Sequence, residues 1–132
     1  MMLEVKLQEG IIQPPAHPAC DGIGAVAEFY GVVRGEENGQ PIAALVYEAY
    51  PGMAEREMRR VAEEEAKRHP VDHVEIIHRT GAIPVGETAI WVRVRSRHRA
   101  EAFGFLAGFM DRLKQDVPIW KVRSLPEEKK ES

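Results

Sequence analysis

The residues best suited to chemistry are the cations in the last third of the chain. A basic run at residues 97–99 precedes a predicted helix, and Lys114 and Lys121 lie at the end of that helix and just beyond it. A helix N-terminus is already positive, so a basic run is favoured there only when an anion completes the site. The pattern predicts an anion-binding site, with the two lysines as candidates for chemistry on the anion.

Each of these cations also has a simpler interpretation. The basic run could be a solvated turn between a strand and a helix. Lys114 would complement the helix dipole at a C-terminus. Lys121, which stands between Trp120 and Val122, could extend its ammonium group into water. The residues alone therefore leave a functional and a structural interpretation open, and they do not define a reaction.

Composition restricts the class of protein. A chain of 132 residues is long enough for one domain with a hydrophobic core. Its formal net charge of -3 argues against a general nucleic-acid binder. The single cysteine, Cys20, excludes an intrachain disulfide and a cysteine-based zinc site, and the scattered histidines lack metal-ligand spacing. No apolar run reaches membrane-spanning length. We expect a cytoplasmic protein that binds neither a metal nor a membrane.

Hydrophobic periodicity predicts alternating strands and helices. An Asn38-Gly39 pair, typical of a two-residue hairpin, separates two of the strands. Residues 81–87 are expected to be a connection without regular structure. The strands are expected at residues 3–7, 25–34, 41–50, 71–79, 88–96 and 119–122, and the helices at 52–68 and 99–114. We predict an α+β domain, with two helices packed on a largely antiparallel sheet.

Two of these elements carry specific side-chain predictions. In the second helix, the apolar stripe is expected to comprise Phe103, Leu106, Met110 and Leu113. In the strand over residues 88–96, Ile90, Val92 and Val94 should share one face, and Trp91, Arg93 and Arg95 the other. The whole chain, residues 1–132, is expected to form one domain. Residues 1–23 would contribute a strand and a proline-rich connector, and residues 125–132 a mobile tail.

Several sequence blocks resemble one family when they are taken together, in order and at compatible spacing. They are Gly24-Ala25 with Phe29–Arg34, Leu45–Met53, Ile77–Gly81, Val85–Glu87, Ser96–Phe103, Met110–Lys114 and Val117–Lys121. This series is similar to the MoaE family, the large catalytic subunits of molybdopterin synthase. The blocks extend over about three quarters of the chain.

The resemblance implies a fold, a reaction and partners. The fold would be of the α/β-hammerhead type. The enzyme would be a sulfurtransferase that converts cyclic pyranopterin monophosphate (precursor Z) to molybdopterin by installing the dithiolene sulfurs. The sulfur would come from the thiocarboxylated C-terminal Gly-Gly of a small ubiquitin-like partner of the MoaD type. The assembly would be a heterotetramer built on a homodimer of large subunits, and no cofactor is implied.

The resemblance also implies roles for individual residues. Lys114 and Lys121 match the two catalytic lysines. Whether each acts as a base, an electrostatic clamp or a covalent group stays open. The residues assigned to substrate binding are Val32, Val33, Arg34, His98, Arg99, Val122 and Arg123. One departure stands out, because family members commonly carry a glutamate two residues after the second lysine, where this chain has Arg123.

Two other classes of function remain open at this point. One is a non-catalytic ligand-binding module of the ferredoxin-like type, which the order of strands and helices also permits. The other is a scaffold that binds a ubiquitin-like partner without chemistry. A binding module would not require Lys114 and Lys121 to converge, so their placement in the fold is the first discriminating observation.

Overall fold

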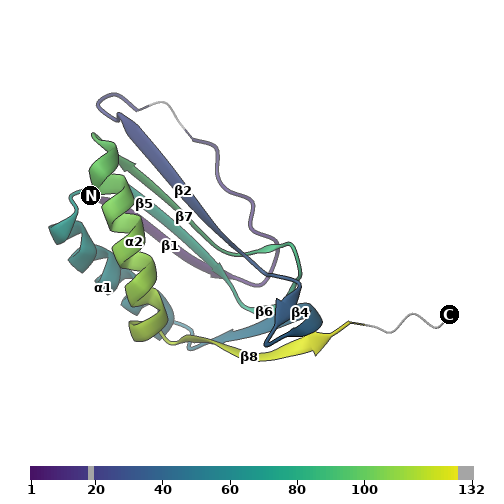
Figure 1. Cartoon of the computed structure of the whole chain (residues 1–132). Helices are drawn as coiled ribbons and strands as arrows, with labels where there is room; N and C mark the ends of the chain where they lie inside the picture. The colour runs from purple at the N-terminus through teal and green to yellow at the C-terminus, as the bar shows by residue number, and fades with distance from the viewer. Residues whose placement is uncertain (18–19, 128–132) are drawn as a thin grey trace.

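The computed structural model describes residues 1–17 and 20–127 and contains two helices and two groups of strands (Figure 1). The elements in chain order are β1 Met2–Gln8, β2 Ala25–Val32, β3 Glu36–Glu37, β4 Gln40–Ala49, α1 Met53–Arg68, β5 His73–Arg79, β6 Gly81–Pro84, β7 Thr88–Ser96, α2 Arg99–Asp116 and β8 Ile119–Pro126. The predicted α+β class is confirmed.

The first sheet has the strand order β1-β5-β7-β2 and carries both helices on one face (Figure 1). The pairs β5–β7 and β2–β7 are antiparallel, whereas β1 and β5 run parallel. Within the main core, Ile90, Val92 and Val94 of β7 pack with Phe105 and Phe109 of α2. The apolar face predicted for β7 is therefore confirmed.

The opposite face of β7 is also buried. Trp91 is fully enclosed in a small cluster with Ile12 and Ile77. Arg93 pairs with Glu75 and donates a hydrogen bond to the Pro15 carbonyl (2.9 Å). The segment before β2, predicted as a connector, thus covers this face of the sheet and has no helix or strand of its own over the described residues.

The second group of strands is built on β4 and lies at one end of the first sheet (Figure 1). β4 pairs antiparallel with β3, β6 and β8. The predicted hairpin is present, with Asn38 and Gly39 in the left-handed region at φ 52° and 79°. A second core cluster, which includes Val33, Leu45 and Ile83, fills this end of the fold.

Two expectations about local structure are wrong. Residues 81–84 form β6, because the short Gly-Ala-Ile-Pro run pairs with β4 although Gly and Pro normally mark a loop. Phe103 is 62% exposed, and the buried line of α2 is instead Ala102, Phe105, Phe109 and Leu113. Leu106 and Met110 are only partly buried. Apolar residues occupy several sides of α2, so more than one stripe fits its sequence.

The expected tail, residues 125–132, begins within β8, and residues 128–132 lie outside the described part.

A close backbone approach fixes the turn that leads into α2. The Gly24 amide donates to the Ser96 carbonyl (3.1 Å), and a Cβ on Gly24 would overlap the Arg97 carbonyl oxygen. We expect Gly24→Ala to lower the free energy of unfolding by about 1–3 kcal/mol, because backbone must move to admit the methyl group. Urea denaturation measures this change. Gly10→Ala, where a Cβ meets open space, is the matched control. Equal stability of the two variants would contradict the prediction.

Candidate functional site

A cavity of about 310 Å³ lies between the two groups of strands and the end of α2. Its polar and charged lining residues are Arg34, Glu37, Tyr47, His78, Lys114 and Lys121, and its apolar lining includes Phe29, Val32, Val33, Leu45 and Ile90. The cavity therefore combines three cations with an apolar wall. Such a combination is typical of a site for an anionic organic ligand.

Arg34 reaches the cavity because the end of β2 is held firmly. The β2–β7 register shifts between Gly31 and Val32. Val33 is then fixed by two backbone hydrogen bonds, one donated to Glu87 (3.0 Å) and one accepted from Gly86 (2.9 Å). Its side chain is buried in the second core cluster. Arg34 is the next residue, so the backbone that carries its side chain is held in place by these contacts.

The two lysines reach the same cavity because the chain turns sharply after α2. The Val117 amide closes the helix on the Leu113 carbonyl (3.3 Å). Pro118 cannot continue the helix, and its carbonyl accepts a hydrogen bond from Tyr50 (3.1 Å). β8 then runs back along β4. Lys114 and Lys121 therefore line one cavity with Arg34, while their chemical roles stay predictions.

Lys121 has a carboxylate partner in the cavity lining. Its Nζ donates to Glu37 Oε1 at 2.8 Å. The pair joins β8 to the β3–β4 hairpin, across 84 positions of the sequence. Sequence analysis did not identify Glu37. The sequence signal that could have indicated Glu37 is its position directly before the Asn38-Gly39 turn, which fixes its place in the hairpin.

His78 was also not identified as a site residue, although its ring lines the cavity. The ring lies edge-on to Tyr47, with 5.6 Å between centroids. Its Nδ1 lies 2.7 Å from the Arg79 carbonyl oxygen. A carbonyl only accepts, so this contact requires the proton on Nδ1 and leaves Nε2 unprotonated in the neutral ring. Burial lowers the pKa of His78 from its ordinary 6.5, and the hydrogen bond to Arg79 offsets only part of that effect.

The lowered pKa of His78 makes an acid-sensitive contribution to stability. As pH falls below about 6.5, the unfolded chain binds a proton at this residue before the folded chain does. Stability is therefore lost as pH falls, by up to about 1.4 kcal/mol per pH unit until the folded-state pKa is reached. Urea denaturation at pH 8 and pH 5.5 should show a smaller loss in His78→Phe than in the unsubstituted chain. The exposed His17, changed to Gln, is the control. Equal losses in the unsubstituted chain and His78→Phe would contradict the assignment.

The other predicted anion-binding residues lie elsewhere. His98 and Arg99 are the N-cap and first residue of α2, and His98 makes no side-chain capping bond. His98 lines a separate hollow with Asp72, Arg97 and Glu101 among others, at the far end of the helix from Lys114. The structure of one chain therefore does not bring them to the lysines. Val122 and Arg123 lie on β8, exposed and outside the cavity lining, with Val122 41% exposed.

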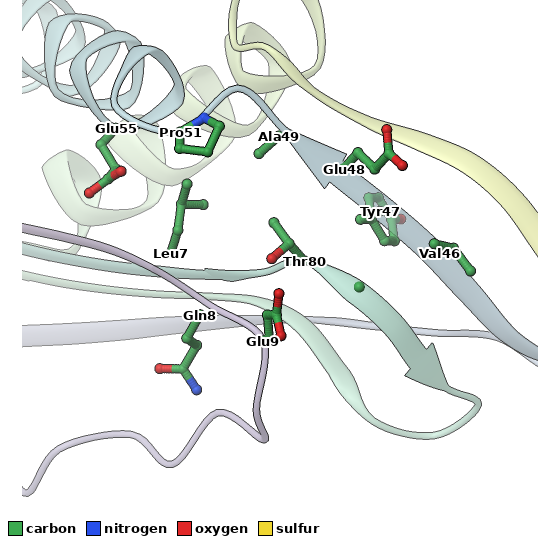
Figure 2. Close-up of a pocket in the computed structure, with 11 residues that line it drawn as sticks. Leu7, Gln8, Glu9, Val46, Tyr47, Glu48, Ala49, Pro51, Glu55 and Thr80 are labelled. Atoms are coloured by element: carbon green, nitrogen blue, oxygen red, sulfur yellow. The ribbon is translucent and has the colours of Figure 1, made fainter.

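A larger hollow of about 580 Å³ lies between the end of β1, β4 and the start of α1 (Figure 2). Its charged lining residues are Glu9, Glu48 and Glu55. Three carboxylates without a lining cation disfavour an anion. The smaller, cationic cavity is therefore the better candidate site.

Within residues 1–17 and 20–127, one group of side chains has ligand atoms close enough to hold a metal. These atoms, from Glu4, His73 and Glu75, lie within 4.8 Å of one another. However, Arg93 already makes two hydrogen bonds to the Glu75 carboxylate (2.8 and 2.9 Å), and Arg95 pairs with it at 3.2 Å. Two guanidinium groups oppose a cation at this position. The group is better explained as an ion-pair network centred on the buried Glu75, with the Glu4 side chain 64% exposed at its edge.

Comparisons with known proteins agree on one family. The family model described as MoaE protein matches residues 4–116. The chain is 39% identical over 104 residues to the human molybdopterin synthase catalytic subunit. The aligned region covers 79% of this chain and 54% of the human protein. It is 39% identical over 107 residues to the Escherichia coli protein of that name, with 81% and 71% covered. The chain thus spans about half the length of the human relative.

The fold agrees with the sequence comparison. A crystal structure of molybdopterin synthase from Staphylococcus aureus superposes with a TM-score of 0.79 at 30% identity, over 96% of this chain and 92% of that one. Neither helix of the described residues has the length and apolar character needed to cross a bilayer.

Proposed function

Because this chain belongs to the MoaE family, we propose that it is the catalytic subunit of a molybdopterin synthase. In this proposal it transfers sulfur from a thiocarboxylated partner to cyclic pyranopterin monophosphate in the cytoplasm. The observation that carries the proposal is the meeting of Arg34, Lys114 and Lys121 on one cavity of about 310 Å³. A volume of this order suits a small organic ligand.

The cavity has the groups that such a reaction needs. Arg34 would bind the cyclic phosphate, since a guanidinium matches phosphate oxygens with paired hydrogen bonds. Opening the phosphate ring and adding sulfur build negative charge and require proton transfers. Lys114 and Lys121 would stabilise that charge or move the protons. Apolar neighbours such as Phe29 and Ile90 strengthen these electrostatic interactions by limiting water.

The partner would enter along β8. This strand pairs with β4 on one edge, and its other edge has no strand partner among residues 1–17 and 20–127. An extended Gly-Gly tail could pair with such an edge, because strand addition needs only backbone groups and glycine needs no side-chain space. Lys121 lies on β8, so a tail along this edge would end near its ammonium group.

The convergence of the lysines favours an enzyme over a passive binding module. A ferredoxin-like module or a scaffold for a ubiquitin-like protein does not require Lys114 and Lys121 to converge on one cavity, whereas the proposed reaction does. An activity assay distinguishes the scaffold from the enzyme, since a scaffold would bind the partner without forming product.

Reconstitution with thiocarboxylated small partner and precursor Z tests the proposal. We expect dithiolene product, detected as molybdopterin, from the full chain with the intact partner. A partner that lacks its last two residues should give no product even if the globular surfaces still bind. Binding without any product would support the scaffold and contradict the enzyme. Product formation with the tail-less partner would contradict the proposed route of sulfur.

A further inference from the structure

Glu37 is the single carboxylate in the lining of the cationic cavity, as far as the described residues go. The other charged lining residues are Arg34, Lys114 and Lys121. Lys121 forms an ion pair with Glu37. Within the described residues, Arg34 and Lys114 take part in no ion pair. Of the three cations that line the cavity, Lys121 therefore has a carboxylate partner, and Arg34 and Lys114 are available to a bound ligand.

This ion pair is not there to hold the fold together. The side chains of Lys121 and Glu37 are 40% and 25% exposed. Ion pairs this accessible contribute little to stability, because water and salt screen them. The geometry is nevertheless well defined, with Nζ 2.8 Å from Oε1. A precise contact with little effect on stability points to a role in arranging the Lys121 ammonium group.

The backbone around Glu37 supports such a role. The two-residue turn at Asn38-Gly39 has both residues at positive φ, the geometry that fits the twist of a tight hairpin. Glu37 is opposite Gln40 in that hairpin, and the Ile42 amide donates to the Gly35 carbonyl at 3.1 Å. The carboxylate is therefore presented from a short, fixed support and not from a long loop.

We propose that Glu37 is a positioning residue for Lys121, a role that rests on the proposed function. Its carboxylate fixes the direction of the Lys121 side chain at the cavity. It also offsets part of the positive charge that Arg34, Lys114 and Lys121 gather there. Glu37 itself repels an anionic substrate, so its removal should affect turnover and not weaken substrate binding.

Steady-state kinetics of the reconstituted enzyme test this role. Glu37→Gln should lower kcat roughly tenfold, because a displaced catalytic group loses its alignment. The KM for precursor Z should stay unchanged or fall. Glu37→Asp, which keeps the charge, should recover part of the loss. Glu36→Gln in the same hairpin is the matched control, because Glu36 does not line the cavity. An equal kcat in Glu36→Gln and Glu37→Gln, or a raised KM in Glu37→Gln, would overturn the proposal.

A double-mutant comparison asks whether Glu37 acts through Lys121. In a Lys121→Ala background, Glu37→Gln should cause no further loss of activity, because the group that it positions is gone. A further tenfold loss would show an independent role and overturn the proposal.

A spectroscopic measurement keeps this inference separate from the proposed function. In ¹⁵N-labelled free protein, an ammonium group held by a carboxylate gives a sharper Nζ signal. The Lys121 signal should broaden in Glu37→Gln and persist in Glu36→Gln. If the unsubstituted chain formed no product, the proposed function would fail, and this measurement would still decide whether Glu37 holds Lys121. An unchanged signal in Glu37→Gln would overturn the inference.

Discussion

Replacement of Lys114 or Lys121 by alanine should reduce molybdopterin formation by roughly a hundred- to a thousandfold. In the proposed reaction, each lysine would place a cation where negative charge develops during sulfur transfer. Both side chains are exposed outside the core, so the free energy of unfolding should change by no more than about 0.5 kcal/mol. Product formation in the reconstituted reaction and urea denaturation measure the two quantities separately.

Lys67→Ala is a matched control for Lys114→Ala. Both lysines lie in the last turn of a helix, where each complements the helix dipole. Lys67 is exposed on α1 and outside the cavity lining. If Lys67→Ala lost as much activity as Lys114→Ala, the effect would come from the helix and not from the cavity. Normal activity in both Lys114→Ala and Lys121→Ala would contradict the catalytic assignment.

Two inactive variants should restore activity to each other when their subunits are mixed. Arg99 and Lys114 lie 15 residues apart on α2, a separation of roughly 22 Å along a helix. One small substrate cannot contact both within one chain. We therefore expect a two-fold related subunit to supply His98 and Arg99 to the cavity that holds Lys114 and Lys121.

Mixing Lys121→Ala with His98→Ala tests this arrangement. Random exchange makes half of the dimers mixed, and each mixed dimer has one intact site of two. Activity should therefore recover to about a quarter of the unsubstituted level. Subunit exchange is verified by mass spectrometry of differently labelled subunits. Mixtures that exchange but remain as inactive as their parents would place the whole site within one chain.

Features set by local periodicity could be predicted from the sequence. The alternation in residues 88–96 gave both faces of β7, and the Asn38-Gly39 pair gave the hairpin. β6 was missed because four residues carry too little periodicity, and only pairing with β4 makes them a strand. Phe103 was assigned to the core because α2 is apolar on several sides, and only the packed neighbours select the buried one.

The site shows the same division. Residue types and spacing pointed to a cationic site, and the family resemblance selected Lys114, Lys121 and Arg34. No spacing rule could bring the two lysines together across the turn at Pro118. Glu37 and His78 escaped notice because their contacts join segments far apart in the chain, which sequence patterns do not record.

Helix α2 is unbroken between residues 99 and 116. In the proposed site, its length would set the distance between the basic residues at its start and Lys114 near its end. The helix carries the cationic turn at one end and Lys114 at the other. One residue inserted into α2 would rotate its two ends relative to each other by about 100° and lengthen the helix by about 1.5 Å. Chain-length variation among relatives should therefore be excluded from α2.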